Sequence, residues 1–552
     1  MRITSIPQIY RNVNRWTEIL STLSKYGLAD WISRLDLSFA KGILKNRDGE
    51  ALAQHARETR IRMALEELGP TFIKLGQILS TRLDVVGGEL GEELKKLQAN
   101  VPADPPEVAR ATIEQELQQP VDSLFVDFDD RPLASASIGQ VHRARLATGE
   151  EVAVKVMHRG IEKQVRVDLD ILSGIAQLAE RVPELVGYQP RRLAAEFQRA
   201  LLRELDFDRE LRNLQQFARN FAGHNSLRIP RPYVELSTSR VLTMQYIDGI
   251  KLSELDQAVC DEAQGSEVAR LGAEIFLEMI FHHGFYHADP HPGNLLLLPA
   301  GGIALLDCGM VGRINESLRE NIEEMLLAIV GYDADRLTSL IVRIGSVPPQ
   351  LDEAQLSADL ADYVAHYAHQ SVDRFDLSGA LSEMIEIIRR YQIMLPAPIA
   401  MLLKVLMMLE GTVRLLNPKF SLMEVMEPYQ TRMVRWRLSP TRHLKKVQRI
   451  TYEMEQLLEL LPRRLREILA QIQAGRFDVH LDHRGLEPSV NRLVLGMLAS
   501  AIFLGSSLLV AQGVWPVRGV SVPGVLGYSV SLLLILRLLR AISKSGHLDR
   551  RR

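Results

Sequence analysis

Two stretches near the C-terminus carry no charged residue, and they restrict the fold of that region more than any other feature. The first runs from Leu493 to Val517; as a helix it would be about 37 Å long, enough to cross a hydrocarbon core of roughly 30 Å. The second, Gly519 to Leu536, is close to the shortest possible span and has Pro523 near its start, where a membrane helix tolerates proline. We expect a transmembrane helical hairpin over residues 492–540; a buried hairpin of a soluble domain is the alternative.

Basic residues are unevenly distributed around this hairpin. Its turn contains only Arg518, and excess positive charge marks the cytoplasmic side of a membrane protein. We therefore expect both flanks of the hairpin, the soluble domain and a basic tail over residues 541–552 on the cytoplasmic side of an inner (cytoplasmic) membrane. The first ten residues lack the apolar run of a signal peptide, so we expect no secretion. The flanking basic residues are Arg492, Arg537, Arg540, Lys544, Arg550, Arg551 and Arg552.

The composition excludes several other classes of protein. Of the 552 residues, 46% are apolar and 24% are charged, as in ordinary globular chains. Lysine plus arginine (66) nearly balances aspartate plus glutamate (68), so we expect no nucleic-acid partner. The two cysteines, Cys260 and Cys308, are too few for a disulfide framework or a thiolate metal site, which favours a reducing compartment.

The pattern along the chain predicts an α+β protein. Alternating segments VHRARL and EEVAVKVM predict a β-hairpin, and RPYVEL and RVLTMQYI predict two further strands. Helical patterns dominate elsewhere, including one long helical stretch after Pro190; a short hairpin, NLLLLPAGGIALLD, interrupts a later helical region. We divide the chain into an amphipathic helical region (1–50), a helical extension (51–124), a sheet-containing lobe (125–250), a mostly helical lobe (251–430) and a basic helical linker (431–491) before the hairpin.

Both ends of the soluble part have two possible environments. The amphipathic helix expected near the N-terminus would lie on a membrane surface or pack on the protein itself. The linker is dense in Arg and Lys between Arg432 and Arg449, which suits anionic lipid headgroups; a solvated helix face is the alternative.

The most specific chemical signal is HADPHPGN followed by ALLDCG. Asn294 is the fifth residue after Asp289, and a short predicted hairpin then leads to Asp307. This order matches the catalytic loop and metal-binding motif of kinases, in which an Asp orients the nucleophile while an Asn and a second Asp hold a metal ion. Because Pro290 and Pro292 prevent a helix, we interpret His287 and His291 as loop scaffolding rather than metal ligands.

Upstream, VAVKV resembles the kinase strand whose lysine contacts the nucleotide phosphates, which assigns that contact to Lys155. A lysine in this position needs an acidic partner from the following helices. Four carboxylates are candidates, and their spacing alone does not separate them: Glu196, Glu204, Asp206 and Glu210.

Two departures from ordinary protein kinases are evident. The loop before Lys155, which should be rich in glycine, consists of Ala134, Ser135, Ala136, Ser137, Ile138, Gly139 and Gln140. Its extra side chains require the triphosphate to be held differently. Asn315, which suits the N-cap of the next helix, follows soon after Gly309 and leaves no long activation segment, so a docking platform for protein substrates is missing. We also expect Gln245 and Ile247, at the end of the last predicted strand, to contact the nucleotide.

These motifs together resemble the UbiB family of atypical kinase-like proteins, which includes the AarF and ADCK proteins. The resemblance rests on KLGQ (Lys74–Gln77), the alanine-rich loop, the ExD motif (Glu204–Asp206), HADPHPGN and Asp307-Cys308-Gly309, and it covers about residues 65–313. It implies a two-lobed protein-kinase-like fold in which the helical extension carries the KxGQ motif and folds over the active site. The hairpin is similar to that of bacterial members.

The resemblance also implies roles for individual residues. Lys74 would pair with Glu204, and Lys155 with Glu210. Asp307 and Asn294 would bind magnesium, Asp289 would be catalytic, and Lys74, Gln77, Glu204 and Asp206 would restrict access to the site. ATP would be the nucleotide, hydrolysed rather than used to phosphorylate proteins. Membrane lipids, a prenylated phenolic lipid, quinone-biosynthesis enzymes and a second copy of the chain are the expected partners.

Three functions agree with the residues. The first is a membrane-anchored, magnesium-dependent ATPase that supports ubiquinone or other isoprenoid-quinone biosynthesis. The second is a small-molecule or lipid kinase, because HADPHPGN also resembles the catalytic loop of choline and aminoglycoside kinases. The third is a nucleotide-binding pseudokinase scaffold, against which the intact Lys155, Asp289, Asn294 and Asp307 argue.

Overall fold

The computed structural model describes most of the chain, in two units that we treat separately: Met1–Ser439 and Pro440–Arg552. The basic run from Arg432 to Arg449, Arg518 and the tail after Lys544 lie outside the described residues, so their predictions stay open. The described residues are 13–28, 55–97, 101–255, 262–299, 301–368, 375–418, 420–426, 451, 454, 466, 486–517 and 520–544.

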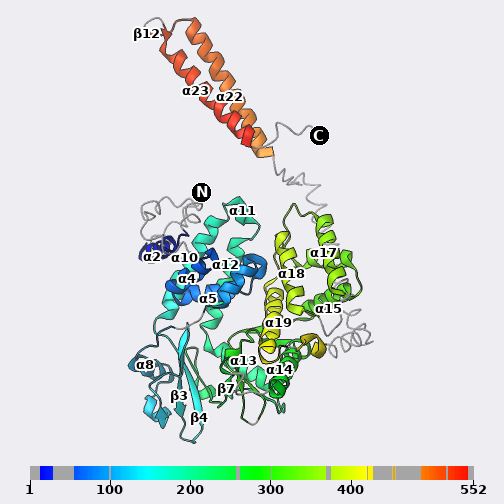
Figure 1. The fold of residues 1–552 in the computed structure, drawn as a ribbon. Helices are drawn as coiled ribbons and strands as arrows, with labels where there is room; N and C mark the ends of the chain where they lie inside the picture. Colours follow the sequence, from blue (N-terminus) through cyan, green and yellow to red (C-terminus); the bar gives the residue numbers. More distant parts are fainter. Residues whose placement is uncertain are drawn as a thin grey trace. The chain divides into compact units, whose positions relative to one another are not determined.

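An antiparallel sheet of five strands forms the smaller lobe of the first unit (Figure 1). β3 and β4 make the predicted hairpin, with Val141 opposite Lys155, and β6 lies on the other side of β4. The strand order is β1-β3-β4-β6, with β2 also paired to β3. The strands are β1 (Asp127–Phe128), β2 (Ala134–Ser135), β3 (Gly139–Arg145), β4 (Glu151–Met157) and β6 (Val241–Gln245).

The helical extension packs against two helices of the smaller lobe, α10 and α12. α5 begins at Pro70, as its sequence predicts, because proline at the first helical position loses no hydrogen bond. Trp16, Ile19 and Leu20 of α2 are buried with Leu68 and Phe72. The N-terminal helix therefore packs on the protein. The helices are α2 (Val13–Lys25), α4 (Arg57–Leu68), α5 (Pro70–Leu79), α6 (Leu83–Val86), α7 (Gly88–Lys95), α8 (Pro106–Leu117), α9 (Val121–Leu124), α10 (Ile161–Ala179), α11 (Pro183–Val186), α12 (Pro190–Glu204) and α13 (Phe207–Asn220).

The larger lobe is mostly helical. α14 and α19 pack together in its core, and the segment NLLLLPAGGIALLD forms the predicted hairpin, β9–β10. β10 also pairs with β5, and β9 with β7, whereas β8 and β11 form a separate pair. Asn315 caps α15 as predicted, by accepting the Leu318 N–H. The elements are β5 (Leu227–Arg228), β7 (Ile250–Lys251), α14 (Glu262–Leu277), a π-helix (Glu278–His283), β8 (Phe285–His287), β9 (Leu295–Leu297), β10 (Ile303–Leu305), β11 (Val311–Arg313), α15 (Glu316–Val330), α16 (Ala334–Ile344), α17 (Glu353–Ala368), α18 (Leu377–Arg390) and α19 (Ala397–Leu416).

Two secondary-structure predictions are wrong. RPYVEL is not a strand: Val234–Leu236 is a 3-10 turn, and only an isolated bridge joins Pro232 to Met244. Prolines in this segment lack the N–H that a strand ladder needs. The single long helical stretch after Pro190 is two helices, because Asp206 has extended dihedral angles and separates α12 from α13.

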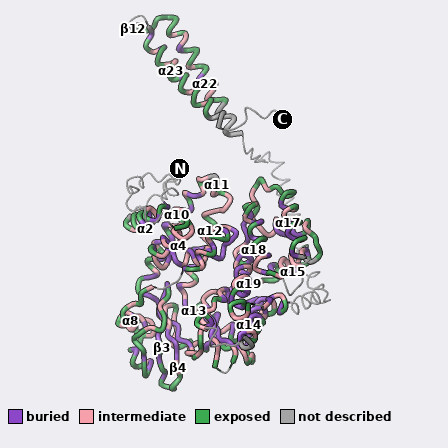
Figure 2. The backbone as a smooth tube through the Cα atoms, in the orientation of Figure 1, coloured by how far each residue is buried: buried purple, intermediate pink, exposed green. Residues whose placement is uncertain are grey.

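The second unit contains two long apolar helices, α22 (Leu486–Ala511) and α23 (Val522–Lys544), joined by the short strands β12 (Pro516–Val517) and β13 (Val520–Ser521). Each is long and apolar enough to cross a membrane, and each candidate span is only 11% buried (Figure 2). Ser507 and Tyr528 hydrogen-bond at 2.8 Å, and Ser531 donates to the Ala499 carbonyl at 2.9 Å. The two helices thus pack as a hairpin with polar contacts between them, and its insertion in a membrane stays a prediction.

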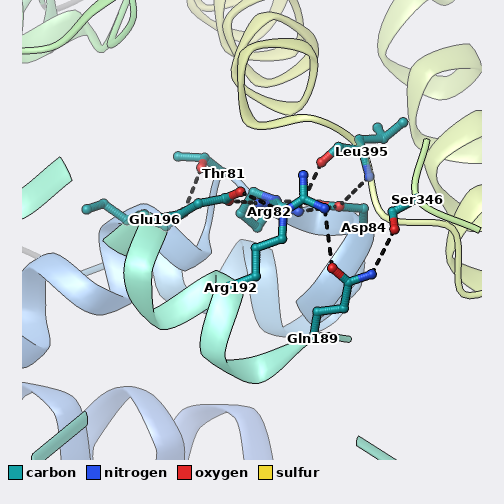
Figure 3. Close-up of polar contacts among 9 residues, drawn as sticks. Thr81, Arg82, Asp84, Gln189, Arg192, Glu196, Ser346 and Leu395 are labelled. Atoms are coloured by element: carbon teal, nitrogen blue, oxygen red, sulfur yellow. Dashed lines mark hydrogen bonds and ion pairs between the residues drawn. The ribbon is translucent and has the colours of Figure 1, made fainter. Parts of the chain in front are cut away.

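A buried polar cluster joins the extension to both lobes (Figure 3). Arg82, 5% exposed, holds both oxygens of Asp84 at 3.0 and 2.8 Å and reaches Glu196 of α12 at 2.8 Å. The backbone of Leu395, in the larger lobe, accepts from Arg82 at 3.2 Å and donates to Asp84 at 3.2 Å. Arg82 therefore fixes the extension to α12 and to the segment before α19 at one point.

We expect Arg82→Leu to lower the free energy of unfolding by about 3 kcal/mol, because it leaves the Asp84 carboxylate buried without its cation. The midpoint of thermal unfolding of the detergent-solubilised protein measures this. Arg192→Leu is the matched control: Arg192 is half exposed and lies 3.4 Å from the same Glu196. Its effect should stay below about 0.5 kcal/mol, and equal effects of the two changes would contradict the importance of the buried cluster.

The larger lobe also buries a lysine. Lys404 of α19 is 7% exposed, and its ammonium has no hydrogen-bond or ion-pair partner among the residues that the structure describes. It borders a cavity of about 10 Å³ that Asp84 and Leu395 also line. Burial lowers the pKa of Lys404, and the opposing charge of Asp289 offsets this only in part.

Lys404→Met should raise the free energy of unfolding by about 1–4 kcal/mol, since an apolar side chain of similar length replaces a buried charge. Because the folded-state pKa lies below the ordinary 10.5, the unfolded chain binds the extra proton between these two values. Wild-type stability should therefore gain from this group as pH rises toward 10.5, and the variant should lose that gain. Denaturant titrations across that pH range measure it, and Lys163→Met, at an exposed position, is the control.

Candidate active site

The catalytic loop follows β8, whose pairing with β11 fixes its direction. Asn294 lies at the end of a 3-10 turn and donates its amide N–H to Asp289 Oδ2 at 2.9 Å and to the Asp289 carbonyl at 3.2 Å. The five-residue spacing therefore folds these two side chains against each other, with the amide oxygen of Asn294 left available as a ligand.

His287 joins the catalytic loop to the acidic loop that begins at Asp307. Its fully buried ring donates from Nε2 to the Asp307 carbonyl at 2.7 Å and accepts the Asp289 N–H at Nδ1, at 3.2 Å. His291 Nδ1 accepts the Gly293 N–H at 3.1 Å. Both histidines hold backbone groups, which confirms their interpretation as loop scaffolding.

The acidic loop holds Asp307 in an unusual conformation. Its φ is +26°, in the region that non-glycine residues seldom adopt, and its Oδ1 accepts the Gly309 N–H at 3.1 Å. The Lys155 ammonium lowers the pKa of Asp307 well below its usual range, although burial opposes this. The Cys308 carbonyl accepts from Asn213 of α13 at 2.9 Å, so the loop is tied to the smaller lobe as well.

Lys155 lies between two carboxylates. Its Nζ is 2.8 Å from Glu210 Oε2 and 3.6 Å from Asp307 Oδ1, and it lies 5.2 Å from the ring centre of Phe207. Burial opposes the charge of Lys155, but the two carboxylates raise its pKa; burial raises the pKa of Glu210 to about 7. The other three candidate partners are engaged elsewhere: Glu196 with Arg82, Glu204 with Lys74, and Asp206 with Arg212.

Lys74 brings the extension into the site. Its Nζ lies 2.9 Å from Glu204 Oε2, and both side chains are largely buried. Burial would lower the pKa of Lys74, but the charges of Glu204, Asp307 and Asp289 raise it. A fixed ammonium therefore lies among the carboxylates that a metal ion would need.

The predicted residues surround one cleft with an internal volume of about 70 Å³. At roughly 10–15 Å³ for each water, this volume corresponds to a few solvent molecules, and the Asp307 side chain that lines the cleft is 54% exposed. The cleft is lined by twelve predicted residues, Lys74, Ala136, Ser137, Ile138, Gly139, Lys155, Glu204, Asp206, Glu210, Asp289, Asn294 and Asp307, and by four that sequence reasoning did not assign to it, Arg203, Phe207, Gly309 and Met310. Adjacency to the ExD and Asp-Cys-Gly motifs was the available signal for these four.

Six predicted residues do not line this cleft. The Gln77 amide donates to the Leu97 carbonyl at 3.1 Å, within the extension. Gln140 is buried, with its side chain bound to the Asp104 N–H at 2.6 Å and to His142 at 2.8 Å. These two amides are thus engaged in structural contacts. The remaining four are Ala134, Ser135, Gln245 and Ile247.

The oxygen ligands in the cleft suit magnesium better than a metal ion whose coordination sites are all filled by protein side chains. Among the described residues, no group of three or more His, Cys, Asp or Glu side chains is arranged to hold a metal. Magnesium usually takes one or two carboxylates and completes its octahedron with water and substrate phosphates. Asp307 and the amide oxygen of Asn294 fit that incomplete set.

Family models match three parts of the chain: the ABC1 atypical kinase-like domain over residues 96–341, the UbiB helical domain over 360–421 and the ABC1/UbiB kinase-like C-terminal domain over 480–544. A solved structure, the complex of Rv3197 with erythromycin from Mycobacterium tuberculosis, is 24% identical, covers 66% of this chain and 93% of its own, and has a TM-score of 0.44.

Similarity to curated proteins extends beyond the motifs. A probable protein kinase UbiB from Shewanella halifaxensis is 31% identical over 92% of this chain and 95% of its own length. A probable protein kinase UbiB from Pseudomonas aeruginosa is 33% identical over 73% of this chain and 77% of its own. An uncharacterised Clostridium pasteurianum protein is 30% identical over 88% and 93%. With a kinase-like fold, the motifs in one cleft and these full-length similarities, the chain belongs to the UbiB/ABC1 family of atypical kinase-like proteins.

Proposed function

We propose that this protein is a membrane-anchored, magnesium-dependent ATPase that supports the synthesis of ubiquinone or another isoprenoid quinone. The observation that supports it most is the cleft itself, where Lys155, Glu210, Asp289, Asn294 and Asp307 converge from separate elements. These are the groups that phosphoryl transfer requires.

Each residue has a defined task in this proposal. Lys155, positioned by Glu210 at 2.8 Å, contacts the phosphates. Asp307 and Asn294 would hold magnesium, which would neutralise charge that develops on the phosphates. Asp289, fixed by Asn294 and His287, orients the attacking water and accepts its proton.

Water is a more suitable acceptor than a protein substrate for two reasons. β11 follows the acidic loop directly and α15 begins at Glu316, so no long segment is available to dock a polypeptide. The extension also places Lys74 in the lining of the cleft, where it would restrict access to the site.

The membrane and lipid parts of the proposal rest on other features. α22 and α23 suit a membrane hairpin, and the basic residues beside it favour an inner membrane with the first unit on the cytoplasmic side. The ubiquinone role follows from the name of the UbiB relatives. A prenylated phenolic lipid is the ligand class, with quinone-biosynthesis enzymes and a second copy of the chain as partners.

A small-molecule or lipid kinase is the second candidate, supported by the same short connection between β11 and α15. It predicts a phosphorylated product and a dependence on an acceptor hydroxyl, whereas an ATPase releases phosphate without one. A pseudokinase scaffold would bind nucleotide and release none.

Asp307→Asn should abolish phosphate release from Mg-ATP and weaken Mg-ATP binding about a hundredfold, because it removes the charged magnesium ligand. Phosphate release by the full chain, in detergent and in anionic liposomes with a phenolic quinone-precursor mimic, measures the first effect, and nucleotide titration the second. Asp208→Asn, on the same helix as Glu210 but outside the cleft lining, is the control. Undiminished affinity in Asp307→Asn would contradict its metal role.

Deletion of the residues after Asn491 should give a folded protein that no longer sediments with membranes, since the hairpin lies in a separate unit. Flotation with anionic liposomes measures this. A truncated chain that still floats with the liposomes would show a second membrane contact in the first unit.

A further inference from the structure

The tip of the alanine-rich loop (residues 134–140) is a tight connection between β2 and β3. Ala136 donates its N–H to the Gly139 carbonyl at 2.9 Å, and residues 136–139 line the cleft. A Cβ at position 139 would collide with the Val156 carbonyl oxygen, so only glycine permits β3 to approach β4 there. The tip is therefore pressed against the end of β4.

One residue after β4 holds this tip from two directions. His158 donates its backbone N–H to the Ile138 carbonyl at 2.9 Å, and its ring Nε2 to the Ala136 carbonyl at 3.0 Å. The side chain is buried, at 6% exposure, and lies outside the cleft lining. His158 thus donates hydrogen bonds to two carbonyl groups of the loop from a position outside the cleft lining.

Because His158 binds two carbonyl groups of the loop, it also sets the direction of the N–H groups in the same peptide units. In a trans peptide the N–H points away from the C=O of the same unit, and the chain has no cis peptide among its described residues. With the Ala136 and Ile138 carbonyls turned toward His158, the N–H groups of Ser137 and Gly139 point away from it. Both residues line the cleft. Among the described contacts, the Ser137 N–H has no hydrogen-bond acceptor.

We propose that His158 is a positioning residue for nucleotide binding, which aims backbone N–H groups of the alanine-rich loop at the phosphates. This inference rests on the proposed function, since it assumes a nucleotide in the cleft. Oriented backbone N–H groups bind phosphate in glycine-rich loops. Here a histidine orients backbone N–H donors of the same kind in a loop whose only glycine is Gly139.

A carboxylate lies close to the other ring nitrogen, Nδ1, which makes no hydrogen bond among the described residues. Asp104, in the segment of the extension between α7 and α8, lies with Oδ2 3.3 Å from His158 Nδ1, and the same oxygen accepts the Arg159 N–H at 3.0 Å. The Asp104 N–H donates to Gln140 Oε1. We expected the Gln140 amide to contact the nucleotide. Instead it binds the backbone of Asp104, the residue that lies beside His158.

The experiment compares Mg-ATP binding and turnover by the full-length protein in detergent with two substitutions. His158→Phe keeps the ring shape and the backbone N–H but removes the donor to Ala136, and we expect about tenfold weaker Mg-ATP binding and a raised KM with kcat nearly unchanged. His158→Gln places an amide N–H near the position of Nε2, and we expect it to restore most of the affinity. Arg159→Gln is the control, because that side chain is exposed and only its backbone N–H contacts Asp104.

Amide hydrogen exchange of the nucleotide-free protein separates this inference from the proposed function. Exchange at residues 136–139 should rise in His158→Phe and return toward wild type in His158→Gln, while thermal unfolding midpoints stay similar. Equal nucleotide affinity in wild type and His158→Phe, or a Gln variant as weak as the Phe variant, would overturn the positioning role. A wild-type protein that binds no Mg-ATP would overturn the proposed function, and this role with it, even if the exchange result holds.

Discussion

The charges that line the cleft are the constraint on which the site depends. The cleft is lined by three basic residues and five acidic ones, a balance of −2 when all are ionised. They are Lys74, Lys155 and Arg203, and Glu204, Asp206, Glu210, Asp289 and Asp307. The pKa of Glu210, raised to about 7, reduces that deficit, and the lowered pKa of Asp307 keeps its charge in place. An isolated triphosphate would be repelled by such a site. A divalent cation restores the balance, which is the electrostatic reason to expect magnesium with the nucleotide.

Uncharged contacts behind the cleft keep these charges in place. His287 bonds to the backbone of both Asp289 and Asp307, and Asn213 holds the Cys308 carbonyl. Thr412 of α19 donates to the Pro290 carbonyl at 3.0 Å. The catalytic and acidic loops are therefore fixed from β8, α13 and α19 together, and neither can move without breaking buried hydrogen bonds, each of which is expensive to leave unmade.

Local rules predicted those parts of the molecule that depend on neighbouring residues. The Asp289–Asn294 spacing, the Pro70 helix start, the Asn315 cap and the long β-hairpin all follow from short-range chemistry, and the structure contains them. The partner of Lys155 could not be predicted from spacing, since four carboxylates were equivalent until Asp206 ended α12 and turned Glu204 and Glu210 toward different lysines. The Arg82 cluster was missed because its contacts join residues more than a hundred positions apart. A pattern of neighbouring residues cannot predict contacts between residues so far apart in the sequence.

The attachments of the cleft walls also indicate which part moves when nucleotide enters. The catalytic and acidic loops are held by several buried hydrogen bonds, and the tip of the alanine-rich loop by two from His158. Lys74, in contrast, is held at the cleft by a single ion pair with Glu204. Part of the negative charge that attracts this ammonium is that of Asp307, and a magnesium ion held by Asp307 would reduce this attraction. The Lys74 side chain should therefore be the first part of the cleft wall to move, while Phe72 of the same helix stays buried with Trp16 of α2.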